Sequence, residues 1–399
     1  MEASRRGAPA IAAALVVAAS LMGDTLLYTV LPVSASRLGI SRPMVGVILS
    51  ANRWVRLVTN PLAGRLYERF PAGMLVVIAL AAGVVSSATY ALPAAIALFL
   101  AGRFLWGFAY SLLRLGSFLA AIDEAPAHAG RMIGNTRAIW GAGYLAGALF
   151  APFAVEAAGW TWACIGAAAI SAVAGLGPAA IVAGWRRGVR FIETEVARAS
   201  VWEPRLAALF VAACLQFAVY AGVLVAAGGF RADELFGGGS PILSWIVPAT
   251  FIAAAFALTQ RVAQVAWTPF AGRFADRSHH AAFAVSTALS LGSIALLALP
   301  LDPLGFVALG ASAFTNGLTA TIAIEYVVAR RSGAYDRPRI LAALHTWQDF
   351  GAAAGALAGG IIAAFGAAPA LLAGSVLIAL TLPLWIGGMR AAERALSAA

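Results

Sequence analysis

The chain repeats itself at a fixed offset of 208 residues within a length of 399. Residues 52–69 read NRWVRLVTNPLAGRLYER, and residues 260–277 read QRVAQVAWTPFAGRFADR. Further on, Arg131, Gly143 and Gly147 recur as Arg339, Gly351 and Gly355. Alanine and glycine matches arise easily in an Ala-rich chain, whereas arginine, proline and acidic matches at one offset do not. The repeat therefore predicts two similar halves, each with one arginine, Arg53 or Arg261, inside an apolar segment.

Apolar stretches long enough to cross a membrane fill most of the chain. Hydrophobic residues make up 62% of it and charged residues only 11%, which is too little charge to cover a soluble protein of this length. A membrane helix needs about 20 apolar residues. The sequence predicts twelve such helices, at 8–33, 44–67, 74–93, 96–120, 131–155, 159–184, 204–230, 243–270, 280–299, 303–329, 339–364 and 367–388. We therefore expect an all-α membrane protein with six helices in 1–184, a polar cytoplasmic linker at 185–203 and six helices in 204–399.

The positive charges lie mainly on one side of these predicted helices. All 27 basic residues are arginine, and the formal net charge is +10. Eighteen arginines fall in the termini and the alternate loops of one side, three in loops of the other side, and six within helices. Because arginine-rich loops stay in the cytoplasm, we expect a multi-pass protein of a bacterial inner (plasma) membrane with both termini cytoplasmic. This placement also argues against nucleic acid as a partner.

The sequence carries none of the common enzymatic or metal-binding patterns. It has no Gly-x4-Gly-Lys-Ser/Thr phosphate loop, no metal-ligand cluster and no nucleophile motif. Cys164 and Cys214 lie in apolar spans and suit neither a disulfide framework nor a metal site. We therefore expect no cofactor, no metal and no enzymatic activity.

Several short motifs resemble those of the major facilitator superfamily. Gly64-Arg65-Leu66-Tyr67-Glu68-Arg69 resembles the turn after that family's second helix, with Glu in place of Asp. Arg103-x-x-x-Gly107 resembles its helix-four motif, and Glu124-x6-Arg131 resembles its turn between helices four and five. The resemblance covers the whole chain. It implies two bundles that rock around a central site, and hence a secondary transporter that works by alternating access; we expect a monomer.

The same resemblance implies a gating role for the cytoplasmic turns. Their acids would cap or pair across the seam between the halves when the cytoplasmic side is closed. The candidate gating residues are Gly64, Glu68, Arg69, Gly272, Asp276, Arg277, Glu124 and Arg131. The alternative is that the arginines of these turns serve topology alone.

Arg53 and Arg261 are the leading candidates for binding substrate. Each lies about 16 Å along its helix from the glycine of the following turn, Gly64 or Gly272. An arginine at the centre of a membrane costs about 2.5–3.5 kcal/mol, so each is expected to face protein or water and to have a partner. A planar guanidinium binds carboxylate, nitrate or phosphate bidentately, which predicts a clamp of two arginines on a small anion. The placement resembles the arginine pair of the superfamily's nitrate/nitrite transporters; the alternative is that acids or helix carbonyls hold each arginine structurally.

Other polar side chains of the spans are candidates for helping to bind the substrate. Arg103, Gly107, Tyr110 and Arg114 share one stripe of the fourth predicted helix. Arg114 is expected to snorkel to the interface, whereas Arg103 and Tyr110 are expected to line a cavity. The remaining candidates are Arg56, Tyr28, Tyr220, Gln260, Gln264 and Asn316.

Three titratable side chains inside the spans are candidates for proton coupling. Asp24 lies about 20 Å along its helix from Ala10, and it is the only acid deep in the first half. His345 and Asp349 are one helical turn apart in the second half. The alternatives are a permanent ion pair of Asp24 with Arg53 or Arg56, and a counter-ion role of Asp349 for Arg261.

A further acid, Glu325, is expected nearer the cytoplasm and to face Arg330 or the following loop. We therefore predict a secondary active transporter that is coupled to protons and moves a small organic or inorganic anion. The first alternative is a proton-driven efflux antiporter of drugs or metabolites, with Asp24 as its coupling site. The second is a membrane scaffold or sensor that transports nothing.

Overall fold

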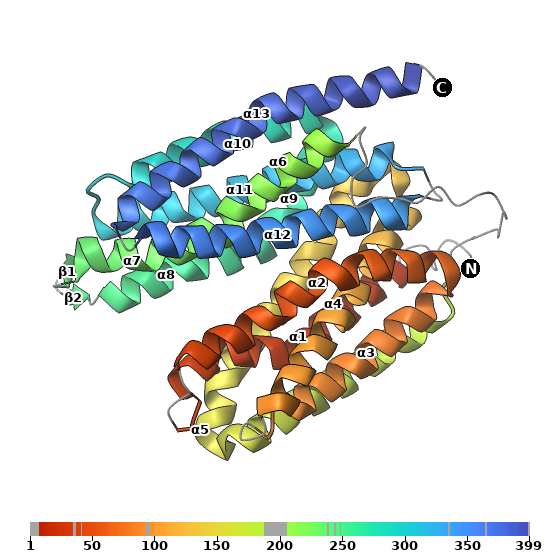
Figure 1. Ribbon diagram of the computed structural model, residues 1–399, viewed down its shortest axis with the longest axis horizontal. Helices are drawn as coiled ribbons and strands as arrows, with labels where there is room; N and C mark the ends of the chain where they lie inside the picture. Colours follow the sequence, from red (N-terminus) through yellow and green to blue (C-terminus); the bar gives the residue numbers. More distant parts are fainter. Residues whose placement is uncertain are drawn as a thin grey trace. The chain divides into compact units, whose positions relative to one another are not determined.

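The computed structural model describes residues 8–34, 37–40, 42–92, 96–186, 206–237, 239–242, 245–247, 249–333, 336–363 and 365–397. These residues are almost entirely helical (Figure 1), which confirms the predicted fold class. From residue 187 onward, the predicted linker at 185–203 lies outside the described residues.

The helices of the first part of the chain follow the predicted spans. They are α1 (Ala8–Ser34), α2 (Arg42–Arg69), α3 (Ala72–Thr89), α4 (Ile96–Glu124), a 3-10 turn (Pro126–His128) and α5 (Ala129–Ala183). The long helix α5 contains a break at Gly159, whose φ of 80° is a conformation that favours glycine. Its two arms correspond to the predicted spans 131–155 and 159–184.

In the second part, two helices continue through a π-helical turn. The elements are α6 (Ala207–Ala218), a π turn (Val219–Val223), α7 (Leu224–Phe236), α8 (Ala249–Val262), a π turn (Ala263–Trp267), α9 (Thr268–Arg277), α10 (His279–Leu297), α11 (Pro303–Arg331), α12 (Arg337–Ala363) and α13 (Ala367–Ser397). Between α7 and α8, strands β1 (Ser240–Ile242) and β2 (Trp245–Val247) form a small antiparallel hairpin. Wider π turns often occur at functional positions, and these two carry Tyr220 and Gln264.

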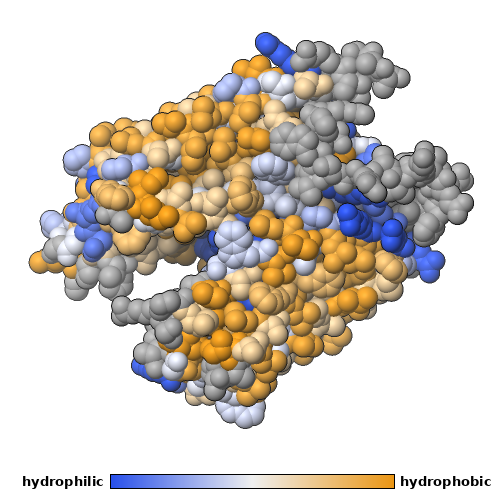
Figure 2. Space-filling model, in the orientation of Figure 1, coloured by the Kyte–Doolittle hydropathy of each residue, from blue (hydrophilic) through white to orange (hydrophobic). Residues whose placement is uncertain are grey.

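Eight stretches of the described helices are long and apolar enough to cross a membrane. The stretch Pro126–Ala183 alone covers two of the twelve predicted spans. Helix α2, which contains Arg53 and Arg56, is not among the eight. The chain is a multi-pass membrane protein. Accordingly, large apolar side chains such as Phe153, Val173 and Val376 are more than half exposed, and hydrophobic residues cover much of each unit's visible face (Figure 2).

Contacts within the chain divide it into two compact units. Unit 1 is Met1–Pro126, Thr136–Val201 and Gly333–Ala342, and unit 2 is Ala127–Asn135, Trp202–Ser332 and Ala343–Ala399. The start of α5 therefore packs within unit 2, and the start of α12 within unit 1. These two exchanged segments stand at the 208-residue offset of the sequence repeat.

Each unit has an aromatic core and glycines that allow close helix packing. In unit 2, the ring of Phe256 stacks on Phe306 with centroids 4.8 Å apart. In unit 1, Tyr90 and Phe99 have centroids 5.0 Å apart. A Cβ at Gly143 would lie 2.5 Å from the carbonyl oxygen of Ala18 in α1. Its counterpart in α12, Gly351, and the next repeated glycine, Gly355, lie so close to α6 that a Cβ on either would overlap an α6 carbonyl oxygen. The repeated glycines therefore bring helix backbones together.

Candidate functional site

A buried ion pair joins α1 to α4 inside unit 1. Nη1 of Arg103 lies 2.5 Å from Oδ1 of Asp24, and the two side chains are 0% and 6% exposed. The Nε of Arg103 donates to the carbonyl oxygen of Ile48 at 2.9 Å. The sequence offered Arg53 or Arg56 as the ion-pair partner of Asp24, and the structure adds Arg103 of helix α4, which pairs with it.

Tyr28 extends this network toward α2. Its hydroxyl donates to the carbonyl oxygen of Leu49 at 2.7 Å and lies 3.3 Å from Oδ1 of Asn52. Nη2 of Arg103 lies 3.4 Å from the same hydroxyl. Tyr28 and Arg103, both predicted to contact substrate, are thus engaged with the protein, and Arg103 has no exposed side-chain surface in this structure.

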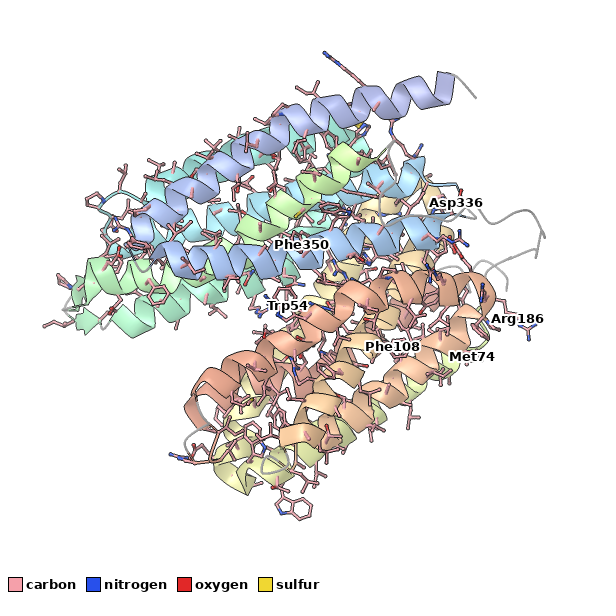
Figure 3. The ribbon with its side chains drawn as sticks, viewed as in Figure 1. Trp54, Met74, Phe108, Arg186, Asp336 and Phe350 are labelled. Atoms are coloured by element: carbon pink, nitrogen blue, oxygen red, sulfur yellow. The ribbon has the colours of Figure 1, made fainter. Side chains whose placement is uncertain are left out.

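Arg53 and Arg261 lie in different units, and each is partly buried. Arg53 is followed by Trp54, whose side chain projects from α2 and is 50% exposed (Figure 3). Arg261 lies at the end of α8, directly before the π turn that holds the buried Gln264. Their role as a clamp stays a prediction.

Three further arginines of unit 1 are buried. Arg56 lies over the ring of Tyr110, with its guanidinium carbon 4.9 Å from the centroid. Arg114 is 5% exposed, so the prediction that it snorkels to the interface is wrong. That prediction used only the depth of Arg114 along α4 and not the side of the helix on which it lies. Arg137 is also 5% exposed and lies over the ring of Phe118 at 5.8 Å. Sequence reasoning missed Arg137, although it lies inside the predicted span 131–155.

The buried acids of unit 2 lie on α11 and α12. Glu325 is 0% exposed and accepts a hydrogen bond from Nε2 of Gln348 at 2.9 Å. Its predicted orientation toward Arg330 is wrong, because Glu325 faces α12 whereas Arg330 lies over the ring of Tyr326 at 5.8 Å. Asp349 and His345 are 4% and 1% exposed.

Three other predicted substrate ligands lie in unit 2. The side-chain amide of Asn316 donates to the carbonyl oxygen of Ser312 in its own helix at 2.9 Å. Tyr220 packs edge-on against Phe217 and Phe314. Gln260 is partly buried at the end of α8.

The end of α2 binds the start of α12 within unit 1. Nε of Arg339 lies 2.5 Å from Oε1 of Glu68, and both side chains are largely buried. Arg337 pairs with Asp123 of α4 at 3.2 Å. Burial raises the pKa of the Glu68 carboxyl above its usual value, and the hydrogen bond and charge of Arg339 offset part of that rise.

In unit 2, the end of α9 binds the start of α5 through a different chemistry. Oδ1 of Asp276 accepts from the backbone N–H of Gly130 at 2.9 Å, and Oδ2 accepts from that of Arg131 at 2.8 Å. A carboxylate is favourable there because the first N–H groups of a helix have no intrahelical partner and carry partial positive charge. Gly272 lies so close to Gly130 that a Cβ on it would overlap the Gly130 carbonyl oxygen.

The remaining candidate gating residues lie at the edge of these contacts. The side chains of Arg69, Arg131 and Arg277 are exposed. Oε2 of Glu124 accepts from the backbone N–H of Ala10 at 3.1 Å, which ties the end of α4 to the start of α1. Gating by all these residues stays a prediction.

The sequence profile of the Major Facilitator Superfamily matches residues 13–263, which is more than half of the chain. The chain belongs to the major facilitator superfamily. It is therefore a secondary transporter of small molecules. A search of curated protein sequences found no significant match.

Solved structures of superfamily members share this fold over nearly the whole chain. The human organic anion transporter MFSD10 (TETRAN) has a TM-score of 0.72 at 15% identity, over 94% of this chain and 98% of that one. FucP in the outward conformation has a TM-score of 0.74 at 13% identity, over 96% and 99% of the chains. The proton:xylose symporter XylE has a TM-score of 0.73 at 13% identity, over 96% of both chains. At these identities the likeness shows the fold alone.

Within this superfamily fold, the net charge of the buried side chains is positive in unit 1 and negative in unit 2 among the described residues. Among the described residues of unit 1, the buried charged side chains are Asp24, Arg56, Arg103, Arg114 and Arg137. Among those of unit 2, they are Arg231, Glu325 and Asp349, with the titratable His345 beside them. Arg231 is held at the end of α7, where it pairs with Glu234 and donates to the last carbonyl oxygens of α10. Unit 1 thus buries an excess of positive charge, and unit 2 an excess of acids.

Proposed function

We propose that this protein moves a small anionic solute across the membrane and couples that movement to protons. The observation that carries the proposal is the excess of buried arginines over buried acids in unit 1. Charged side chains within a membrane protein are costly and mark substrate or ion pathways. A pathway that is rich in guanidinium groups favours anions and repels cations, because guanidinium keeps its charge at all physiological pH values.

Arg53 and Arg261 are the proposed pair that grips the anion. Each stands at the same place in its copy of the repeat, eleven residues before Gly64 or Gly272. Each is partly buried in its own unit, whereas the side chain of Arg103 is completely buried. Two such groups, one on each moving bundle, would hold a carboxylate or similar group bidentately.

The proton-coupling groups proposed for this cycle are Asp349 and His345, with Asp24 as the candidate of unit 1. Both α12 side chains are buried one helical turn apart, and a histidine titrates near neutral pH. Asp24 is held by Arg103 in this structure. Proton coupling through Asp24 would require that pair to open during the cycle.

Transport assays in proteoliposomes test this function. Wild-type protein is expected to accumulate labelled lactate, succinate or nitrate when a pH gradient is imposed, and empty liposomes measure passive leak. Folded Arg53→Gln and Arg261→Gln proteins are expected to show an uptake rate at least tenfold lower than that of the wild type. Arg65 is an exposed arginine of the same helix as Arg53, and Arg65→Gln is expected to keep the wild-type rate. Asp349→Asn is expected to keep anion exchange but to lose accumulation driven by the gradient.

Two outcomes of these assays count against the proposal. Full uptake by folded Arg53→Gln and Arg261→Gln proteins would show that these two arginines do not bind the anion. If the protein instead moves lipophilic cations against a proton gradient and moves none of the anions, it is an efflux antiporter.

A further inference from the structure

Helix α9 and the residue directly before it present two unlike faces. The buried face carries small residues, Thr268, Ala271, Gly272 and Ala275. It packs on the start of α5, where the hydroxyl of Thr268 lies 2.9 Å from the carbonyl oxygen of Gly134. The opposite face is exposed and carries three rings and two cations: Trp267, Phe270, Arg273, Phe274 and Arg277. With about 3.6 residues per turn, these five positions fall within about one third of the helix circumference, and we call them the aromatic–arginine face.

The rings of this face are largely open to the surroundings of the protein. Trp267, Phe270 and Phe274 are 44%, 57% and 36% exposed. The indole N–H of Trp267 donates to the hydroxyl of Thr319 in α11 at 3.0 Å, and the indole centroid lies 6.1 Å from that of Phe270. The one polar group of the indole is therefore engaged with α11, and the ring presents hydrocarbon to its surroundings.

The two arginines of the face stand one helical turn apart. The guanidinium carbon of Arg273 lies 5.7 Å from the ring centroid of Phe270. Within the described part of the chain, no acid forms an ion pair with Arg273 or Arg277. Asp276 is next to them in sequence, but its carboxylate oxygens accept from backbone N–H groups at the start of α5. Like charges four residues apart on a helix repel each other, and a bound phosphate group would offset that repulsion.

The aromatic–arginine face crosses the predicted boundary of the membrane. The predicted span 243–270 ends at Phe270, so Trp267 lies inside the span and both arginines lie beyond it. Along the helix axis, Arg273 is about 9 Å and Arg277 about 15 Å from Trp267. Aromatic side chains are enriched at the membrane–water interface, and basic residues just outside a span attract anionic lipid headgroups. The order along the helix, with rings first and charges after them, matches the order of acyl chains and phosphate in a phospholipid.

The 208-residue repeat provides an internal comparison. In α2 the corresponding positions are Thr59, Leu62, Arg65, Leu66 and Arg69. Both arginines recur, and those of α2 are also exposed, so membrane topology accounts for the charges of both copies. Topology does not account for the rings, which occur only in the α9 copy. A ligand that is both anionic and rich in hydrocarbon gives a physical reason for that difference.

We propose that the aromatic–arginine face of α9 binds a phospholipid with an anionic headgroup, such as phosphatidylglycerol. The phosphate accepts hydrogen bonds from Arg273 and Arg277, because planar guanidinium groups suit phosphate. An acyl chain lies along the three rings. Phosphatidylcholine carries a choline cation beside its phosphate, which weakens its attraction to two arginines, and a soluble anion gains nothing from the rings. The site does not depend on which solute the protein transports.

Quenching of Trp267 fluorescence by brominated lipids tests this site. The full-length protein is reconstituted in phosphatidylcholine vesicles that contain a fixed share of brominated phosphatidylglycerol or brominated phosphatidylcholine. Because the chain has 11 tryptophans, the Trp267→Phe protein is measured in parallel, and the difference between the two signals isolates Trp267. We expect this difference signal to give an association constant for phosphatidylglycerol at least fivefold that for phosphatidylcholine. Equal constants would overturn the proposal.

Paired variants compare the two copies of the repeat, each with its own Trp267→Phe reference. The double variant Arg273→Gln, Arg277→Gln is expected to bring the ratio of the two association constants close to one. Arg65→Gln, Arg69→Gln removes the same number of charges from α2 and is expected to leave the ratio unchanged. If both double variants lower the ratio equally, the preference reflects the net charge of the protein and the site on α9 is wrong.

The contribution of the rings has its own test. Phe270→Leu, Phe274→Leu gives α9 the leucines that α2 has at these positions. This variant is expected to lower the ratio at least twofold but to keep part of the preference for phosphatidylglycerol, because both arginines remain. A ratio equal to that of the wild type would show that the rings take no part, and the site as proposed would be wrong.

Two measurements distinguish the lipid from other occupants. Glycerol phosphate added at constant ionic strength is expected to leave the quenching unchanged, and relief of the quenching would show that the arginines bind a soluble anion instead. The wild type and Phe270→Leu, Phe274→Leu are expected to sediment alike in detergent. A dimer that only the wild type forms would show that the face contacts a second copy of the chain and not a lipid.

A second method keeps the test open if Trp267→Phe does not fold. Native mass spectrometry counts the phosphatidylglycerol molecules that remain bound to the wild type and to the two double arginine variants. At least one fewer is expected on Arg273→Gln, Arg277→Gln than on the other two proteins. Equal numbers on all three would overturn the proposal.

Discussion

Arg103 and Asp24 form an ion pair in the core of unit 1, with 2.5 Å between Nη1 and Oδ1 and almost no exposed surface on either side chain. They come from helices α4 and α1, and the guanidinium also donates to a carbonyl oxygen of α2. One charged contact therefore fixes three helices of the unit. Because neither group reaches solvent, removing one partner leaves an uncompensated charge in a medium of low polarity.

We predict that Asp24→Asn destabilises the protein by about 3–5 kcal/mol, because the buried Arg103 loses its counter-ion. The measurement is the free energy of unfolding in a detergent titration. The double variant Asp24→Leu, Arg103→Met is expected to recover most of the loss, since paired removal of two buried charges is often neutral. As a control, Glu156→Gln removes an exposed pair with Arg37 at 3.8 Å and is expected to change nothing measurable. A double variant less stable than Asp24→Asn would contradict this account.

Two glycines of α12 give a matched pair of substitutions. A Cβ at Gly355 would overlap the carbonyl oxygen of Ala218 in α6, whereas a Cβ at Gly360 would meet nothing within 4 Å. We expect Gly355→Ala to destabilise unit 2 by about 1–3 kcal/mol through overpacking. Gly360→Ala is expected to stabilise α12 by about 0.5–1 kcal/mol through the lower conformational entropy of the unfolded alanine. Thermal unfolding of the two variants in the same detergent measures the difference, and equal midpoints would refute close packing at Gly355.

The burial of the Glu68 carboxyl beside Arg339 predicts a pH dependence of stability. Glu68 lies beyond the predicted span 44–67, and burial raises the pKa of its carboxyl above the usual 4.5. The folded state therefore binds the proton more tightly than the unfolded state. Its contribution to stability is fully present below pH 4.5 and is lost as the pH rises through the raised pKa.

Glu68→Gln lacks this titration, so the wild-type midpoint of thermal unfolding minus that of the variant is expected to fall as the pH rises from 4.5. Arg339→Gln removes the contacts that lower the pKa of Glu68. In that background the fall is expected at higher pH. A wild-type minus Glu68→Gln difference that is flat or rises with pH would contradict the predicted direction.

The fold was predictable because its signals are local and repeated. Span length and the 208-residue offset predict helices and two related halves. The partner of Asp24 was not predictable in the same way. Arg103 is 79 residues distant, and periodicity within one helix does not reveal how that helix is rotated against its neighbours.

The errors at Arg114 and Glu325 have this same origin. Both residues were placed by their depth along a helix, which can be read directly from the sequence. Their burial depends on which face of α4 and α11 turns toward other helices, and the sequence does not give that orientation. The exchange of 127–135 and 333–342 between the units is likewise a long-range property. The sequence repeat indicated that these segments are equivalent without indicating where they pack.

The contact of Gly272 with the start of α5 predicts a shift in the transport cycle. A Cβ at Gly272 would overlap the carbonyl oxygen of Gly130, and the adjacent carboxylate of Asp276 holds the N–H groups of Gly130 and Arg131. Gly272→Ala is therefore expected to disfavour the state in which α9 and the start of α5 are joined. Since an alternating-access transporter visits states that differ in such contacts, the variant is expected to populate the separated state more and to turn over more slowly.

Cysteine labelling measures that shift. Ala129→Cys places a thiol at a position that is 1% exposed at the start of α5, in a background where the buried Cys164 and Cys214 are replaced by alanine. Gly272→Ala is expected to raise the rate at which a charged maleimide labels this thiol by at least threefold. Gly292→Ala in α10, where a Cβ meets nothing within 4 Å, is expected to leave the rate unchanged. If Gly272→Ala labels no faster than Gly292→Ala, the joined contact does not control access to the start of α5.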